Sequence, residues 1–278
     1  MQKLATGVYV ESAFAGVTVG AVVTKEGIVC IDTPSHPVDA QKWRQKLRQL
    51  SSKPILYVIN TDHHRDRIVG NQWFNAPVIA HEFTGERLRL YPEILKSAGI
   101  ESGPDYEIAK ELAGVHIVPP QITFATEMVL LKKDREIVLQ HRPGSAPGAL
   151  WVLLPGSGIV FTGDSVVDSH PFLAEANIDQ WLEQLVDLRR AKFPAKTIVP
   201  GRGKATGKDK LTRLQNYLKF VKRKLPSGRS KRAKFDVQGV SAELIRKFPS
   251  PENQREAVAR RVRAGLERMV VSLYGESV

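Results

Sequence analysis

Residues 61–71 read Thr-Asp-His-His-Arg-Asp-Arg-Ile-Val-Gly-Asn and come shortly after an apolar run, Ile55–Ile59. Imidazole and carboxylate groups so close together are typical of metal sites and of acid–base sites, because both groups offer lone pairs and exchange protons. Arg67 departs from that pattern, since a guanidinium is always protonated and cannot ligate a metal ion. The segment therefore predicts a polar site just past a strand, with a fixed cation inside it.

This segment resembles the T-H-x-H-x-D-H-x-x-G-N metal loop of the metallo-β-lactamase superfamily. The positions in register are Thr61, His64, Asp66, Gly70 and Asn71. Other stretches are similar to further landmarks of the family, in the same order: 7–33 to the first β-meander and its acidic turn, 78–81 to the next strand, 144–148 to the G-H-[ST]-P-G turn, 158–164 to the strand that ends in G-D, and 198–203 to P-G-H-G. The resemblance covers residues 5–205.

Four positions that carry ligand histidines in the family carry other residues here: Asp62, Arg67, Ser145 and Arg202. The resemblance implies that the family's five histidines and two aspartates hold two metal ions, which activate a bridging water and polarise the substrate. It also implies that Asp164 matches the aspartate that bridges the two metals.

We expect protein cations to fill the second metal position, because the guanidiniums of Arg67 and Arg202 suit forked hydrogen bonds to clustered aspartates. Two like unit charges 4 Å apart cost roughly 4 kcal/mol at an effective dielectric of 20, and a divalent ion doubles that cost. The sequence thus predicts no cofactor, or at most one weakly bound divalent ion such as Zn, Fe or Mn. The candidate ligands are Asp62, His64, Asp66 and Asp164.

Three classes of function stay open. The preferred prediction is a non-hydrolytic binding or regulatory protein, in which Arg67 and Arg202 form an internal salt-bridge network or, with Ser145, bind a small phosphate or carboxylate. The first alternative is a hydrolase of an ester, thioester or phosphoester, which works with one metal or with Asp66 or His64 as its catalytic general base. The second alternative is a basic nucleic-acid-binding module. Fold resemblance alone does not choose among them.

Two further histidines are expected to stand outside the chemistry. His63 falls at the variable position of the family's loop, so its side chain is expected to point away from the site. His170 follows the G-D strand and is expected to be a solvated loop residue.

The apolar pattern predicts the elements that position these groups. Short β-rich runs bounded by Gly, Pro or charged residues predict strands at 17–23, 55–59, 128–131, 137–139, 150–154 and 159–161. Apolar residues at three- and four-residue intervals predict helices over 37–50 and 178–190. Together with the resemblance, they predict an α/β fold: a four-layer αββα metallo-β-lactamase-like sandwich with a C-terminal helical tail. The candidate ligands then fall on loops just past strands.

The composition changes beyond the resemblance. Residues 219–235 hold eight basic residues and no acidic one, in a chain of net charge +12, and nucleic acid would bind through this run. Ser250-Pro251-Glu252 predicts the start of a last helix. Its apolar stripe is expected to pack on the body or on the second subunit of a homodimer, and consists of Val262, Leu266, Met269, Val270 and Leu273. We predict a family domain at 1–208, with the basic segment and C-terminal helices of 209–278 packed on it.

The chain is large enough to bury a sizeable core, with 278 residues of which 42% are hydrophobic. Its single cysteine, Cys30, lies in an apolar run and is expected to be a buried free thiol. Glu11 interrupts the N-terminal apolar run and no stretch reaches the length that spans a bilayer, so neither a signal peptide nor a membrane partner is expected. We expect a cytoplasmic protein without disulfides.

Overall fold

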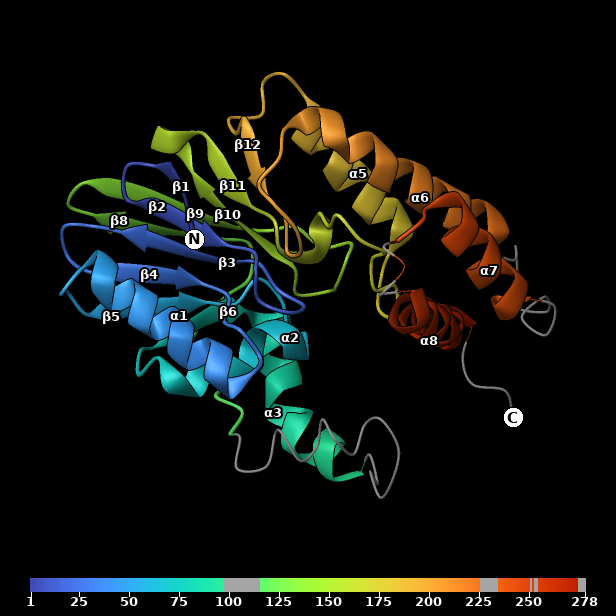
Figure 1. Cartoon of the computed structure of the whole chain (residues 1–278), viewed down its shortest axis with the longest axis horizontal. Helices are drawn as coiled ribbons and strands as arrows, with labels where there is room; N and C mark the ends of the chain where they lie inside the picture. The colour runs from blue at the N-terminus through green and yellow to red at the C-terminus, as the bar shows by residue number, and fades with distance from the viewer. Residues whose placement is uncertain (98–115, 226–234, 251, 253–254, 275–278) are drawn as a thin grey trace.

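The computed structural model describes residues 1–97, 116–225, 235–250, 252 and 255–274, and contains two β-sheets that face each other (Figure 1). The seven-stranded sheet has the order β1 (Gln2–Ala5), β2 (Val8–Glu11), β3 (Val19–Val23), β4 (Ile28–Ile31), β5 (Ile55–Ile59), β6 (Val78–His81) and β7 (Ile122–Phe124). The five-stranded sheet has the order β12 (Thr197–Val199), β11 (Ile159–Phe161), β10 (Leu150–Leu154), β9 (Arg135–His141) and β8 (Glu127–Lys132).

Helices cover the outer faces of both sheets (Figure 1). The α-helices are α1 (Pro37–Leu50), α2 (Arg65–Ile68), α3 (Glu82–Ser97), α5 (Ile178–Arg189), α6 (Leu211–Lys224), α7 (Val237–Lys247) and α8 (Arg255–Tyr274). Short 3-10 turns lie at η1 (Val69–Trp73), η2 (Pro155–Ser157), η3 (Gly163–Ser165) and η4 (Lys208–Lys210).

Three apolar clusters separate the four layers. Alternation along β10 shows how they form, because successive side chains of a strand point to opposite faces of the sheet. Leu150, Val152 and Leu154 join the cluster between the two sheets, whereas Trp151 and Leu153 join the cluster under α5 and α6. The third cluster joins the outer face of the seven-stranded sheet to α1, and contains Ala21, Cys30, Ala40, Trp43 and Leu47. The predicted α/β sandwich with C-terminal helices is confirmed.

The strand ends explain why polar residues meet in one place. Strand β4 runs parallel to β5, and β11 runs parallel to β12. The carboxyl ends of these pairs carry Asp32, the 60–68 segment, Asp164 and Arg202. Parallel strands end at the same edge of a sheet, and such edges are where α/β proteins build their sites. The two pairs therefore bring residues separated by up to 170 positions in sequence to one edge of the sandwich.

The C-terminal helices pack on the sandwich. Val262, Leu266 and Met269 of α8 are buried in the same cluster as Trp151 of β10, while Leu273 is 47% exposed. Most of the predicted apolar stripe thus packs on the body of its own chain. This cluster contains residues from both sides of the predicted boundary at 208, which stays a prediction. Within the described ranges, no helix is long and apolar enough to cross a membrane.

Candidate functional site

Four aspartates and two arginines meet at this edge in a group that we call the aspartate–arginine cluster: Asp32, Asp62, Asp66, Asp164, Arg67 and Arg202. All of them except Asp66 are buried. Burial in a medium of low polarity strengthens the attraction between opposite charges. It also makes a charge without a partner strongly unfavourable in free energy. The partners of each charged group therefore decide what the cluster can do.

Arg67 lies at the centre of the cluster, with 0% of its side chain exposed. Its Nη2 donates to Asp164 Oδ1 at 2.6 Å, and its Nη1 donates at 3.2 Å to both Asp32 Oδ2 and Thr61 Oγ1. Its Nε lies 2.9 Å from Asp62 Oδ1, an ion pair without hydrogen-bond geometry. The surrounding carboxylates outweigh the effect of burial and raise the pKa of Arg67. All three guanidinium nitrogens thus face protein oxygens.

Arg202 approaches the same aspartate from β12. Its Nη2 donates to Asp164 Oδ2 at 2.6 Å and lies 3.0 Å from Asp66 Oδ2, while its Nε donates to the carbonyl oxygen of Gly16. Each oxygen of Asp164 therefore accepts from a different arginine. Gly201 permits this approach, because a Cβ there would lie 2.5 Å from Asp164 Oδ1 and 2.5 Å from the backbone carbon of Gly163.

His64 lies beside Asp62, at the rim of the cluster. Its Nδ1 is 3.0 Å from Asp62 Oδ1, and its backbone N–H donates to the same oxygen at 2.8 Å. Burial acts to lower the pKa of His64, but the carboxylates of Asp62, Asp164 and Asp66 outweigh it and raise the pKa to about 9. For Asp62, burial is likewise outweighed, here by Arg67 and His64, so its pKa falls below the ordinary value.

Asp32 is the member whose role the sequence did not indicate. Its carboxylate accepts from the backbone N–H and the hydroxyl of Thr61, and from Arg67. Burial raises its pKa to about 7, although Arg67 acts in the opposite direction. Asp32 also has a φ of 55°, in a region that few non-glycine residues adopt. Asp32, in the turn after β4, therefore holds Thr61 in place at the start of the 61–71 segment.

The remaining predicted site residues lie close to the cluster but have other partners. Ser145 is buried and shares a hydrogen bond with the hydroxyl of Ser165 at 3.3 Å. His63 turns to Glu175, with 3.3 Å between Nε2 and Oε2, and its ring lies beside that of His64. The hydrogen bond from His63, with a further contact to Arg87, lowers the pKa of Glu175 to about 2. Glu175 lies in none of the sequence motifs, so its pairing with His63 could not be predicted from them.

One group among the described residues could hold a metal ion, namely Asp62, His64 and Asp164, whose candidate ligand atoms lie within 4.8 Å of one another. Asp62 Oδ2 is buried and has no hydrogen-bond partner in the described part of the chain, which leaves one lone-pair donor available. Both oxygens of Asp164, by contrast, accept from guanidinium groups. Asp66 Oδ2 lies 3.0 Å from Arg202, so the fourth predicted ligand is also paired.

The predicted nucleic-acid segment is only partly described, because residues 226–234 lie outside the described ranges. Its first part, from Lys219 to Lys224, forms the end of α6. Lys222 pairs with Asp179, and Lys224 pairs with Glu243. Part of the positive charge at this end of α6 is therefore balanced by carboxylates.

Comparisons with known proteins agree with the fold and with the position of the cluster. The family model described as Metallo-beta-lactamase superfamily matches residues 14–202, which contain every member of the cluster. A metallo-beta-lactamase type 2 of Pseudomonas aeruginosa is 27% identical over 212 residues, covering 72% of this chain and 76% of that protein.

Solved structures show the same architecture. The metallo-beta-lactamase from Pontibacter korlensis has a TM-score of 0.59 and 21% identity, covering 78% of this chain and 97% of that one. The DIM-1 metallo-beta-lactamase has a TM-score of 0.62 and 21% identity, covering 79% and 96%. Because the family model spans more than half of the sequence, the chain belongs to the metallo-beta-lactamase superfamily.

Proposed function

We propose that this protein is a non-hydrolytic member of the superfamily that acts by binding or regulation, with Arg67 and Arg202 in the electrostatic place of two metal ions. The observation that carries the proposal is the environment of Asp164. This residue matches the metal-bridging aspartate, and its two oxygens accept from two different guanidiniums at 2.6 Å each. Charge-assisted bonds of this length are among the strong ones in proteins.

The charge balance supports the same proposal. Asp62, Asp66 and Asp164 are opposed by Arg67 and Arg202, and His64, with its pKa near 9, supplies a third positive charge at neutral pH. Asp32, whose pKa is raised to about 7, adds at most one negative charge. The negative excess of the cluster and His64 is therefore at most one charge, which is much less than two divalent ions would add. Such ions would also lie close to fixed cations, where like charges repel by several kcal/mol. The residues present therefore do not fit a two-metal centre.

A bound anion would meet only part of the predicted anion-binding set. Arg67 has no exposed surface and its nitrogens face protein oxygens. Arg202 is 9% exposed as a residue, and its Nη1 is a buried atom without a hydrogen-bond partner among the described residues. An anionic ligand of the cluster would accordingly be held by Arg202, with Arg67 acting only to fix the aspartates.

A hydrolase with a single metal is the second candidate, and the compact group formed by Asp62, His64 and Asp164 favours it. An ion held there would supply polarisation of a substrate oxygen and activation of water. The unpaired Oδ2 of Asp62 suits such an ion. Asp164 suits it less well, because an ion would have to displace a guanidinium from one of its oxygens.

Elemental analysis of protein purified without chelators from zinc-supplemented cells tests the proposal. We expect less than one equivalent of zinc, iron or manganese per chain. The matched gain-of-function variant carries Asp62→His, Arg67→His, Ser145→His and Arg202→His, which restores the imidazoles of the family's loops, and it is expected to bind more metal than the wild type. One tightly held ion in the wild type would favour the second candidate, whereas two would overturn the proposal.

A further inference from the structure

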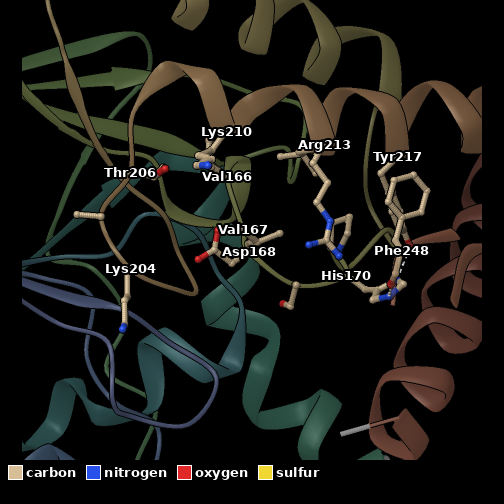
Figure 2. A pocket seen from close by; sticks show the side chains of 14 residues that line it. Val166, Val167, Asp168, His170, Lys204, Thr206, Lys210, Arg213, Tyr217 and Phe248 are labelled. Carbon is tan, nitrogen blue, oxygen red and sulfur yellow. Dashed lines mark hydrogen bonds between the residues drawn. The ribbon is translucent and has the colours of Figure 1, made fainter. Parts of the chain in front are cut away.

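A separate cavity lies where the C-terminal helices meet the sandwich (Figure 2). It has a volume of about 300 Å³, and no member of the aspartate–arginine cluster lines it. One wall is the 166–171 segment after η3. The other walls come from 204–206, from the first two turns of α6 and from Phe248 after α7, all beyond the residues that the family model matches. Most walls of the cavity therefore lie outside the residues that the family model matches.

One end of the cavity carries charges that the protein does not neutralise. Lys204, Lys210 and Asp168 lie at this end, together with Thr206 (Figure 2). We find no ion-pair or hydrogen-bond partner for the side chains of Lys204 and Asp168 in the described part of the chain. Lys210 has only a 3.7 Å contact with Asp209, with both side chains more than 70% exposed, and such exposed pairs contribute little.

The beginning of α6 adds to the positive potential. Lys210 occupies the N-cap position, Arg213 lies in the first turn, and that turn contains no acidic residue. The N-terminus of a helix carries partial positive charge, so cations there are unfavourable unless an anion is near. Arg213 uses one nitrogen for the carbonyl oxygen of Pro249 and reaches down from α6 toward His170 (Figure 2). The cavity thus holds three cations against the single carboxylate of Asp168.

The other end is lined by the rings of His170, Tyr217 and Phe248. His170 is 3% exposed, which corrects the expectation that it is solvated. Its Nε2 is 2.7 Å from the carbonyl oxygen of Phe248 and its Nδ1 is 3.2 Å from the hydroxyl of Tyr217. A neutral imidazole satisfies both contacts by donating from Nε2 and accepting at Nδ1. The rings of Tyr217 and Phe248 lie 4.9 Å apart, and Phe248 is the more exposed of the two, because Tyr217 is 3% exposed.

We propose that this cavity binds a small organic phosphate or carboxylate that also carries a planar apolar group. The anionic head contacts Lys210 and Arg213 at the start of α6, and the apolar group packs toward Tyr217 and Phe248. Asp168, at the charged end, selects for a hydroxyl or amine donor on the ligand. This proposal does not depend on the absence of metals from the aspartate–arginine cluster, because the two regions share no residue.

Calorimetric titration of the full chain with phenyl phosphate and with benzoate tests the proposal and separates the two head groups. Inorganic phosphate represents the anionic head alone, and benzyl alcohol represents the planar apolar group alone. We expect saturable binding of phenyl phosphate or benzoate, and weaker binding of each half. In the double variant Lys210→Ala/Arg213→Ala, binding should weaken at least about tenfold, as expected for the loss of charge-assisted hydrogen bonds.

The matched control is Lys192→Ala/Lys219→Ala, which removes the same charge from exposed positions outside the cavity. It should bind the probes as the wild type does, and both double variants should unfold at the wild-type urea concentration. The proposal is overturned if neither phenyl phosphate nor benzoate binds, if benzyl alcohol binds as tightly as both, or if the two double variants lose affinity equally.

Discussion

The aspartate–arginine cluster and the cavity beside α6 differ in how their charged side chains are paired. In the cluster, the guanidinium of Arg67 is fully buried and its nitrogens face protein oxygens, so each cation pairs with carboxylates of the protein. At the cavity, the side chains of Lys204 and Asp168 are solvent-exposed and have no ionic partner among the described residues. Backbone pairing between Val167 and Arg202 holds the two regions close together.

This difference shows how charged residues can stabilise the fold in one region and be available to a ligand in another. Buried ion pairs gain little net stability relative to apolar packing, but removal of one partner is costly because the other charge stays buried. Charges that are already matched hold the loops of the superfamily in place. Charges that remain unmatched around a cavity are available to a ligand. We therefore expect substitutions in the cluster to affect stability and substitutions at the cavity to affect binding.

Arg67→Ala should have the largest effect of the substitutions that test this contrast. It leaves Asp62, Asp164 and Asp32 buried without their central cation, and should lower the free energy of unfolding by about 3–5 kcal/mol. Urea denaturation followed by circular dichroism measures the change. The control is Arg65→Ala on the same helix, where the side chain is exposed and the expected change is within about 0.5 kcal/mol. A cost for Arg67→Ala no greater than that of the control would refute the structural role of the cluster.

Arg202→Ala should have an intermediate effect. It removes one of two cations from Asp164, which keeps its bond to Arg67, and Arg202 is itself slightly exposed. Loss of a hydrogen bond to a charged group costs about 1.5–3 kcal/mol, so the urea midpoint should fall by less than in Arg67→Ala. Arg202→Lys keeps the charge without the fork and should recover only part of the loss. Full recovery by lysine would show that the geometry of the guanidinium is unimportant.

The smallest expected effect concerns His170, whose contacts close the apolar end of the cavity. Burial, together with the charge of Arg213, lowers the pKa of His170 below its ordinary value of 6.5. The unfolded state therefore binds a proton below pH 6.5 while the folded state resists it, so stability is full above pH 6.5 and falls as the pH drops below it. One such proton changes the free energy of unfolding by at most about 1.4 kcal/mol per pH unit.

His170→Gln supplies the comparison, because an amide can also donate to Phe248 and accept from Tyr217 without titrating. Urea denaturation at a series of pH values from neutral to mildly acidic should show a shallower loss of stability for this variant than for the wild type. Identical pH profiles would show that His170 is not held neutral by its surroundings.

Much of the fold could be predicted from sequence, because its signals are local. The predicted strands at 55–59, 150–154 and 159–161 agree with the structure residue for residue, and the helix over 37–50 does so too. Apolar alternation and turn residues are sufficient there. Boundaries were less certain elsewhere: the first long strand begins at Val19 rather than Val17, and the last helix is described from Arg255, after the predicted capping residues.

The polar sites also differ in how far local sequence signals predict them. Motif positions identified five of the six members of the cluster, since each occupies a position that the family's pattern marks. Asp32 belongs to the acidic turn of that pattern, which does not indicate its partner. Its pairing with Arg67 depends on the parallel contact between β4 and β5. The cavity could not be predicted, because its walls meet through contacts such as His170 with Phe248, which are 78 residues apart. No local periodicity encodes such a meeting.

The most direct test of the central claim is anomalous diffraction at the zinc absorption edge, from crystals grown with zinc. We predict no stoichiometric peak between Asp62, His64 and Asp164, with the guanidiniums of Arg67 and Arg202 bonded to the two oxygens of Asp164. Two peaks in the cluster, with both arginine side chains displaced outward, would contradict the claim and identify a two-metal hydrolase site.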